Sequence, residues 1–150
     1  MKSWWMLMTD VDTALELRDV PLPEPGPGQL RVRVQAASLN RGEFVLGHGL
    51  HGKAGSWKAV GGEAAGVVDA LGAGVQGWQL GDRAMGRCAG GFSEYALLDT
   101  AEAMAVPAAL SWDEAAAIPL AYMVAFDMLV LQGRLQAGEW MLINGVSSGV

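Results

Sequence analysis

Residues 30–36 read LRVRVQA, and their strict alternation decides how the rest of the sequence is interpreted. One side of an extended chain here would carry Leu30, Val32, Val34 and Ala36, with arginine and glutamine on the other side. The stretch is therefore predicted to be a half-buried β-strand. Residues 21–28 before it hold four prolines spaced two apart. Because proline excludes helix and regular strand pairing, we interpret them as an extended connector.

Further short strands are predicted on both sides of this one. Residues 1–20 indicate a hairpin with a turn at 9–12, and residues 61–72 a strand whose small side chains allow close backbone approach. Glycines at 74, 77 and 81 punctuate more short strands, and residues 90–98 supply another, whereas 46–58 is predicted to be a surface loop. Short strands at this spacing predict a small β-barrel.

The pattern changes at Ser111, where Ser111, Asp113 and Glu114 form a capping signal. A short helix is expected near 112–117 and a longer one near 120–132, divided by Pro119 and ending by Gly133.

The last eleven residues, 140–150, read WMLINGVSSGV, an apolar strand that enters a glycine-serine loop. Doubly wound α/β folds use such a loop to bring backbone N–H groups against a pyrophosphate. We therefore expect the chain to be the front part of a nucleotide-dependent enzyme that ends inside its cofactor loop.

Composition excludes several classes of protein. The net charge is −6 and the basic residues are scattered, which argues against a nucleic-acid groove. The single cysteine, Cys88, excludes an internal disulfide and a cysteine-rich zinc site and favours a reducing compartment. No signal peptide is recognisable, and Pro119 and Asp127 interrupt the longest apolar run. A cytoplasmic protein with neither a nucleic-acid nor a membrane partner is expected.

Six segments in order over nearly the whole chain resemble the medium-chain dehydrogenase/reductase superfamily, and specifically its zinc-independent quinone oxidoreductase branch. They are the proline-rich lead into Leu30–Ala36, Ser38–Glu43 (SLNRGE), Gly61–Val68, Gly81–Arg83, Gly91–Leu98, and Ala115–Leu129 followed by Leu142–Val150. The resemblance implies a mainly β fold with α, in three parts. Residues 1–110 would form a GroES-like, partly open β-barrel on the substrate side. Residues 111–136 would be connecting helices, and 137–150 the first strand and glycine loop of a truncated Rossmann α/β domain.

The resemblance also bears on zinc. Zinc-bearing alcohol dehydrogenases of the superfamily have a cysteine and a Gly-His-Glu where this sequence has Asn40 and Gly62. Glu63 alone cannot hold a tetrahedral zinc with an open position. His48 and His51 are interpreted as solvated loop histidines, with chelation as the alternative. We therefore expect no metal.

Without zinc, the acceptor must take hydride with help from hydrogen bonds alone, which favours conjugated carbonyls. The resemblance accordingly implies an enzyme parent that reduces a small-molecule quinone or α,β-unsaturated carbonyl with NADPH. It also implies that the parent forms a homodimer, as is general in the family. NADPH in preference to NADH rests on the resemblance. The 150-residue chain alone is expected to bind cofactor poorly and to be inactive, because the helix and second strand of the cofactor site are missing from it.

The resemblance assigns candidate site residues position by position. The candidate catalytic residues are Asn40, Glu43 and Tyr122. The candidate cofactor-binding residues are Asn40, Val124, Gly145, Val146, Ser147, Ser148, Gly149 and Val150. Each catalytic candidate has a structural alternative: a turn cap before Gly42 for Asn40, a solvated loop carboxylate for Glu43, and core packing for Tyr122. Val124 departs from the threonine frequent in the family, so its side chain cannot hydrogen-bond the cofactor.

Three other functions stay open. They are a zinc-type alcohol dehydrogenase, an enoyl reductase of fatty acid or polyketide assembly, and a non-catalytic GroES-like binding module. A strand at 140–146 would normally be paired on both edges, so in this chain we expect the last dozen residues to fray or to pair with another copy.

Overall fold

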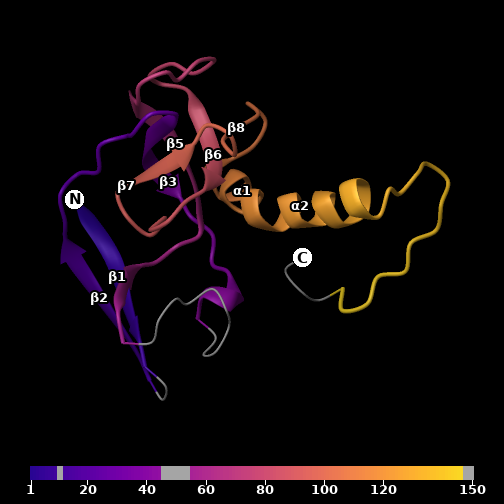
Figure 1. The fold of residues 1–150 in the computed structure, drawn as a ribbon, viewed down its shortest axis with the longest axis horizontal. Coiled ribbons are helices and arrows are strands. Elements are labelled where there is room, and N and C mark those ends of the chain that lie inside the picture. Colours follow the sequence, from indigo (N-terminus) through magenta and orange to yellow (C-terminus); the bar gives the residue numbers. More distant parts are fainter. Residues whose placement is uncertain (10–11, 45–54, 147–150) are drawn as a thin grey trace.

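The computed structural model describes residues 1–9, 12–44 and 55–146, and it contains two antiparallel β-sheets with helices at one side (Figure 1). The smaller sheet has the order β2-β1-β4, with bounds β1 Lys2–Met8, β2 Thr13–Asp19 and β4 Trp57–Ala59. The larger has the order β7-β3-β5-β6-β8, with bounds β3 Gln29–Ala36, β5 Glu63–Leu71, β6 Arg83–Arg87, β7 Tyr95–Asp99 and β8 Met104–Ala105. The mainly β, partly open barrel with helices predicted from the sequence is confirmed.

The predicted strand at 30–36 is β3, which pairs with β5 on one edge and β7 on the other. Its apolar side supplies Leu30 and Val32, both fully buried. They belong to the main core cluster, which comprises Leu30, Val32, Val68, Ala84, Ala96 and Leu98. Burial of these side chains against the neighbouring strands is the main stabilisation of the barrel.

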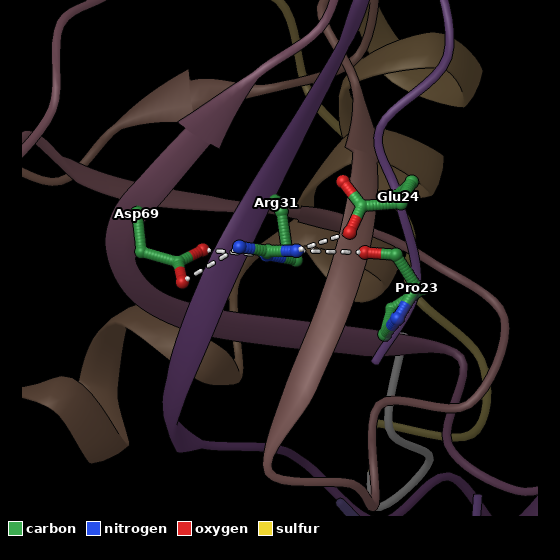
Figure 2. Close-up of polar contacts among 4 residues, drawn as sticks. All are labelled: Pro23, Glu24, Arg31 and Asp69. Carbon is green, nitrogen blue, oxygen red and sulfur yellow. Dashed lines mark hydrogen bonds and ion pairs between the residues drawn. The ribbon is translucent and has the colours of Figure 1, made fainter. Parts of the chain in front are cut away.

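The polar side of β3 departs from the prediction of a half-buried strand, because Arg31 on that side is also buried. Its guanidinium donates to both carboxylate oxygens of Asp69 on β5, from Nε at 2.9 Å and from Nη2 at 3.2 Å. Nη1 donates to the backbone carbonyl of Pro23 at 3.0 Å, and the Glu24 carboxylate lies 3.6 Å away (Figure 2). An alternating pattern cannot distinguish an arginine that faces water from one that meets a buried partner.

The helical segment follows the predicted capping signal. Helix α1, Trp112–Ala116, starts with a complete capping box: the Ser111 hydroxyl accepts from the Glu114 N–H, and the Glu114 carboxylate accepts from the Ser111 N–H. Helix α2, Pro119–Phe126, starts at the predicted proline and continues as a π-helical stretch, Asp127–Gln132. Within the described residues, neither helix is long and apolar enough to cross a lipid bilayer.

The strand predicted at 140–146 is not formed, which agrees with the expectation that the last dozen residues fray in this chain. The described residues after Gln132 contain neither helix nor strand, and the segment runs clear of the barrel in Figure 1. Trp140 is fully exposed and Leu142 is 87% exposed. The physical reason is that a central parallel strand is held by ladder hydrogen bonds on both edges, and no described segment offers it a partner.

Strand β4 lies partly inside the predicted loop at 46–58. Trp57 pairs with Leu7 of β1, and Lys58 with Met6. Three residues are too few to show a period of two, so only pairing with a distant strand reveals this one.

The Arg31–Asp69 pair should contribute measurably to stability. Replacing Asp69 with asparagine removes the nearer of the two carboxylates and leaves the buried guanidinium only Glu24, at 3.6 Å. We therefore expect a loss of about 2 kcal/mol in the free energy of unfolding. Urea denaturation of the two proteins measures this loss. The exposed Lys2–Asp19 pair, 2.7 Å apart, is the matched control, and Asp19→Asn should leave the midpoint unchanged. Equal effects of the two substitutions would contradict the importance of the buried pair.

Candidate functional site

The candidate site centres on Glu63, whose side chain is buried near the start of β5. Its Oε1 atom accepts hydrogen bonds from the Ser38 hydroxyl and from Asn40 Nδ2, the latter at 2.8 Å. Its Oε2 atom accepts from the Leu120 N–H at 2.6 Å. Because Pro119 occupies the first position of α2, the Leu120 N–H is among the unpaired donors at that helix end. Glu63 therefore joins the loop after β3 to the start of α2.

Asn40 immediately precedes a short 3₁₀ turn, Arg41–Glu43, but its side chain makes no capping hydrogen bond there. Its Nδ2 donates instead to Glu63, with a longer contact of 3.3 Å to the Ser38 oxygen. The turn-cap alternative for Asn40 is therefore wrong. A carboxylate only accepts hydrogen bonds, so Glu63 fixes which end of the Asn40 amide faces it.

Glu43 closes the same turn and reaches back to β5. Its Oε1 accepts the Gly62 N–H at 2.8 Å. Its Oε2 is buried and has no hydrogen-bond partner in the described part of the chain. Burial raises the pKa of Glu43, and the Glu63 charge acts in the same direction, while the Gly62 N–H, the Asn40 amide and Lys58 oppose the rise. The alternative of a fully solvated carboxylate is wrong.

A cleft of about 550 Å³ lies beside these groups. Its wall combines apolar and polar side chains, among them Met6, Asn40, Glu43, Lys58, Val60, Arg87, Cys88, Glu102 and Leu120. The mixture of apolar wall and a few polar groups is typical of a small-molecule site.

The structure places only some of the predicted site residues at the cleft. Asn40 and Glu43 line the cleft. Tyr122 and Val124 on α2 are 66% and 37% exposed and are not among the described lining residues, so core packing of Tyr122 is also wrong in this chain.

The cofactor-loop candidates do not join the site either. Gly145 and Val146 are exposed in the segment after the helices. Ser147, Ser148, Gly149 and Val150 lie outside the described residues, as do His48 and His51.

The sequence analysis missed Glu63 as the centre of the site and considered it only as a zinc ligand. A signal was present, because Glu63 is the one charged residue within the small and apolar stretch 59–68. A charged side chain in such a stretch stays buried only if it finds partners.

The side chains around the cleft determine whether it could hold a catalytic zinc ion. The family resemblance places Gly62 where zinc-bearing alcohol dehydrogenases have histidine. A Cβ placed there would lie 2.6 Å from Glu43 Oε1. An imidazole at 62 therefore requires the Glu43 carboxylate to move from its present place. Among the described residues, no group of three or more histidine, cysteine or acidic side chains is placed to hold a metal ion.

Comparison with known proteins finds one matching family model and similar relatives. The family model described as alcohol dehydrogenase GroES-like domain matches residues 26–108. The spectinabilin polyketide synthase system protein NorB of Streptomyces orinoci is 36% identical over 99% of this chain, which covers 7% of that protein. The human synaptic vesicle membrane protein VAT-1 homolog is 34% identical over 91% of this chain, which covers 35% of that protein.

Among solved structures, a quinone oxidoreductase of Pseudomonas syringae pv. Tomato DC3000 superposes with a TM-score of 0.71 at 28% identity. The superposition covers 91% of this chain and 42% of that one. This chain thus spans less than half the length of each of these proteins. The barrel, the matched domain and these relatives together show that the chain belongs to the alcohol dehydrogenase GroES-like domain family, in the quinone oxidoreductase-like branch of the medium-chain dehydrogenase/reductase superfamily.

Proposed function

We propose that the chain is the substrate-side part of a zinc-independent oxidoreductase that reduces quinones or α,β-unsaturated carbonyls with NADPH. The observation that carries the proposal is the cleft in which Asn40 and Glu43 meet around Glu63. The similarity to the P. syringae quinone oxidoreductase supports this reaction class. The proposed cofactor contacts in the glycine loop, and the roles of Tyr122 and Val124, rest on the family resemblance.

The side chains in the cleft favour an acceptor that needs no metal. Both Glu63 oxygens already accept hydrogen bonds from the protein, and Gly62 provides no ligand. Polarisation of a ligand oxygen would thus depend on hydrogen-bond donors in the wall. Quinones and conjugated carbonyls accept hydride on carbon with that degree of assistance, whereas simple alcohol oxidation in this superfamily relies on a metal.

Asn40 has a positioning role in this proposal. Its Nδ2 is committed to Glu63, so the amide is held in one orientation with its Oδ1 atom left to accept a hydrogen bond. The carboxamide N–H₂ of a nicotinamide ring is a suitable donor for that oxygen. Glu63 and Ser38 would then act through Asn40 rather than on the substrate.

Polyketide assembly provides a second candidate function. The similarity to a polyketide synthase system protein over nearly the whole of this chain favours reduction of an enoyl thioester attached to a carrier. The two functions differ in the substrate they prefer. A kcat/KM for a carrier-tethered enoyl thioester at least 100-fold above that for the free enone would select the second.

The primary test compares the full-length protein with the 150-residue chain. We expect the full-length protein to oxidise NADPH in the presence of cyclohex-2-enone or a benzoquinone, and the chain alone neither to turn over nor to quench its tryptophans on NADPH addition. Zinc should be well below one equivalent in tag-free preparations of both. Ethanol with NADP⁺ is the control substrate and should give no reaction. Stoichiometric zinc, or no NADPH binding by the full-length protein, would refute the proposal.

Asn40→Asp tests the positioning role with almost no change in shape. It replaces the donor that faces Glu63 with an acceptor, so two carboxyl groups compete for the same space. We expect kcat/KM for the enone to fall at least about tenfold, equivalent to about 1.4 kcal/mol of transition-state stabilisation. Glu24→Gln, at a carboxylate that is 85% exposed, is the matched control and should keep full activity. Unchanged kinetics in Asn40→Asp would exclude the role.

Cys88 lines the cleft but should not act as a nucleophile. Burial raises the pKa of its thiol to about 12, and the nearby Glu43 and Glu63 charges contribute to the rise. Only the thiolate reacts readily, so modification by a disulfide reagent near pH 8 should be about a thousandfold slower in the native protein than in urea. Rapid native-state labelling, followed by absorbance, would contradict this prediction.

A further inference from the structure

Strand β2 is a long free edge of the smaller sheet. It pairs with β1 on one side only, in a regular register over Thr13–Asp19. The other edge strands in the described part of the chain are shorter, because β4 has three residues, β7 five and β8 two. Figure 1 shows β2 on the outside of the molecule, away from the helices. A long, regular free edge is a template for pairing with another strand.

The backbone of β2 leaves alternate residues without partners. Met1 and Val20 exchange both of their backbone hydrogen bonds, at 2.7 Å and 2.9 Å. Because such pairs recur at every second residue, the even-numbered residues of β2 direct their backbone groups toward β1. The N–H and C=O groups of Leu15 and Leu17 therefore point to the open side, where no described strand pairs with them.

One face of β2 is suited to an apolar contact. Leu15 and Leu17 are 53% and 48% exposed and lie opposite Met6 and Trp4 of β1. Met6 is fully buried and Trp4 is 43% exposed, so this apolar face continues from the core to the open edge. The strand contains neither proline nor lysine, with which proteins commonly protect a free edge.

The two charged side chains within β2 neutralise each other on the opposite face. Arg18 donates to Glu16 Oε2 from Nε at 3.0 Å and from Nη2 at 2.8 Å. The guanidinium carbon of Arg18 also lies 5.3 Å and 4.1 Å from the ring centres of Trp5 and Trp57. Two aromatic faces thus hold the charge in place. A paired and fixed charge does not protect the edge as a mobile lysine would.

We propose that β2 pairs with β2 of a second copy of this chain, antiparallel across a two-fold axis that passes between the two Glu16 residues. This register places Leu15 opposite the partner's Leu17, and Leu17 opposite the partner's Leu15. The outward backbone groups of both leucines are then satisfied, and the two smaller sheets become one continuous sheet. The interface does not depend on the proposed reaction.

Further contacts favour this register over its neighbours. Each Glu16 lies diagonal to the partner's Arg18, so two carboxylates share two guanidinium groups. Thr13 lies opposite the partner's Asp19. The N–H of Thr13 already donates to a neighbouring carboxylate, so only its carbonyl is left to accept the N–H of the partner's Asp19. A shift of register places a leucine opposite Thr13 or Asp19 and loses the two apolar pairs.

A single cysteine substitution reports the register directly. The two copies of residue 16 would face each other without a backbone hydrogen bond between them, about 4.5 Å apart at Cα, which a disulfide can span. We expect Glu16→Cys in the full-length protein to form a covalent dimer with oxidised glutathione, seen on non-reducing gels. Cys88 does not compete, because burial raises the pKa of its thiol to about 12.

Ala14→Cys is the matched control for this cross-link, since residue 14 is exposed on the same strand. Its two copies would lie more than about 13 Å apart, so it should remain uncross-linked. Equal cross-linking of Ala14→Cys, or no cross-linking of Glu16→Cys, would overturn the proposal.

Association in solution is tested with Leu17→Lys in the full-length protein. The lysine places a charge opposite the partner's Leu15, so the dissociation constant measured by sedimentation velocity should rise at least about tenfold. Leu22→Lys is the matched control, because Leu22 is 41% exposed but lies in the proline-rich connector outside β2. Any other interface of the longer protein is the same in both variants. Unchanged association of Leu17→Lys would overturn the second copy as the partner of β2.

Discussion

The buried carboxylate of Glu63 is the interaction on which the arrangement of the site depends. It binds the Ser38 hydroxyl and the Asn40 amide of one loop and the first free backbone N–H of α2. These groups come from two places in the chain, and each would lose its orientation if the carboxylate were removed. Loss of one partner of a buried charged hydrogen bond costs more than an average contact, since the remaining groups stay desolvated.

A second buried ionic contact fixes the sheet that carries Glu63. Arg31 joins β3 to Asp69 on β5 and to the backbone of the proline-rich connector. Strand β5 thus carries two acidic residues with different roles. Asp69 links neighbouring strands of the barrel, and Glu63 links the barrel to helix α2. The same strand determines both the stability of the fold and the geometry of the cleft.

The elements that depend only on local sequence signals were predicted correctly. The period of two at 30–36 predicted β3, and Ser111 with Glu114 predicted the capping box of α1. The elements that failed depend on distant partners. Arg31 is buried only because Asp69 meets it, β4 exists only because β1 pairs with it, and the segment 140–146 has no described neighbour strand. Asn40 and Glu43 were found through resemblance, but their link to Glu63 and Gly62 is a tertiary contact that no spacing reveals.

The absence of a side chain at Gly62 couples changes at this position to the side chain of Glu43. A Cβ at position 62 would lie 2.6 Å from Glu43 Oε1, so a larger residue there requires the flexible end of the Glu43 side chain to move. Substitutions at 62 and 43 together should therefore not behave as the sum of each alone. Any mutational path toward a metal-binding side chain at 62 thus displaces the Glu43 carboxylate from its present hydrogen bond with the Gly62 N–H.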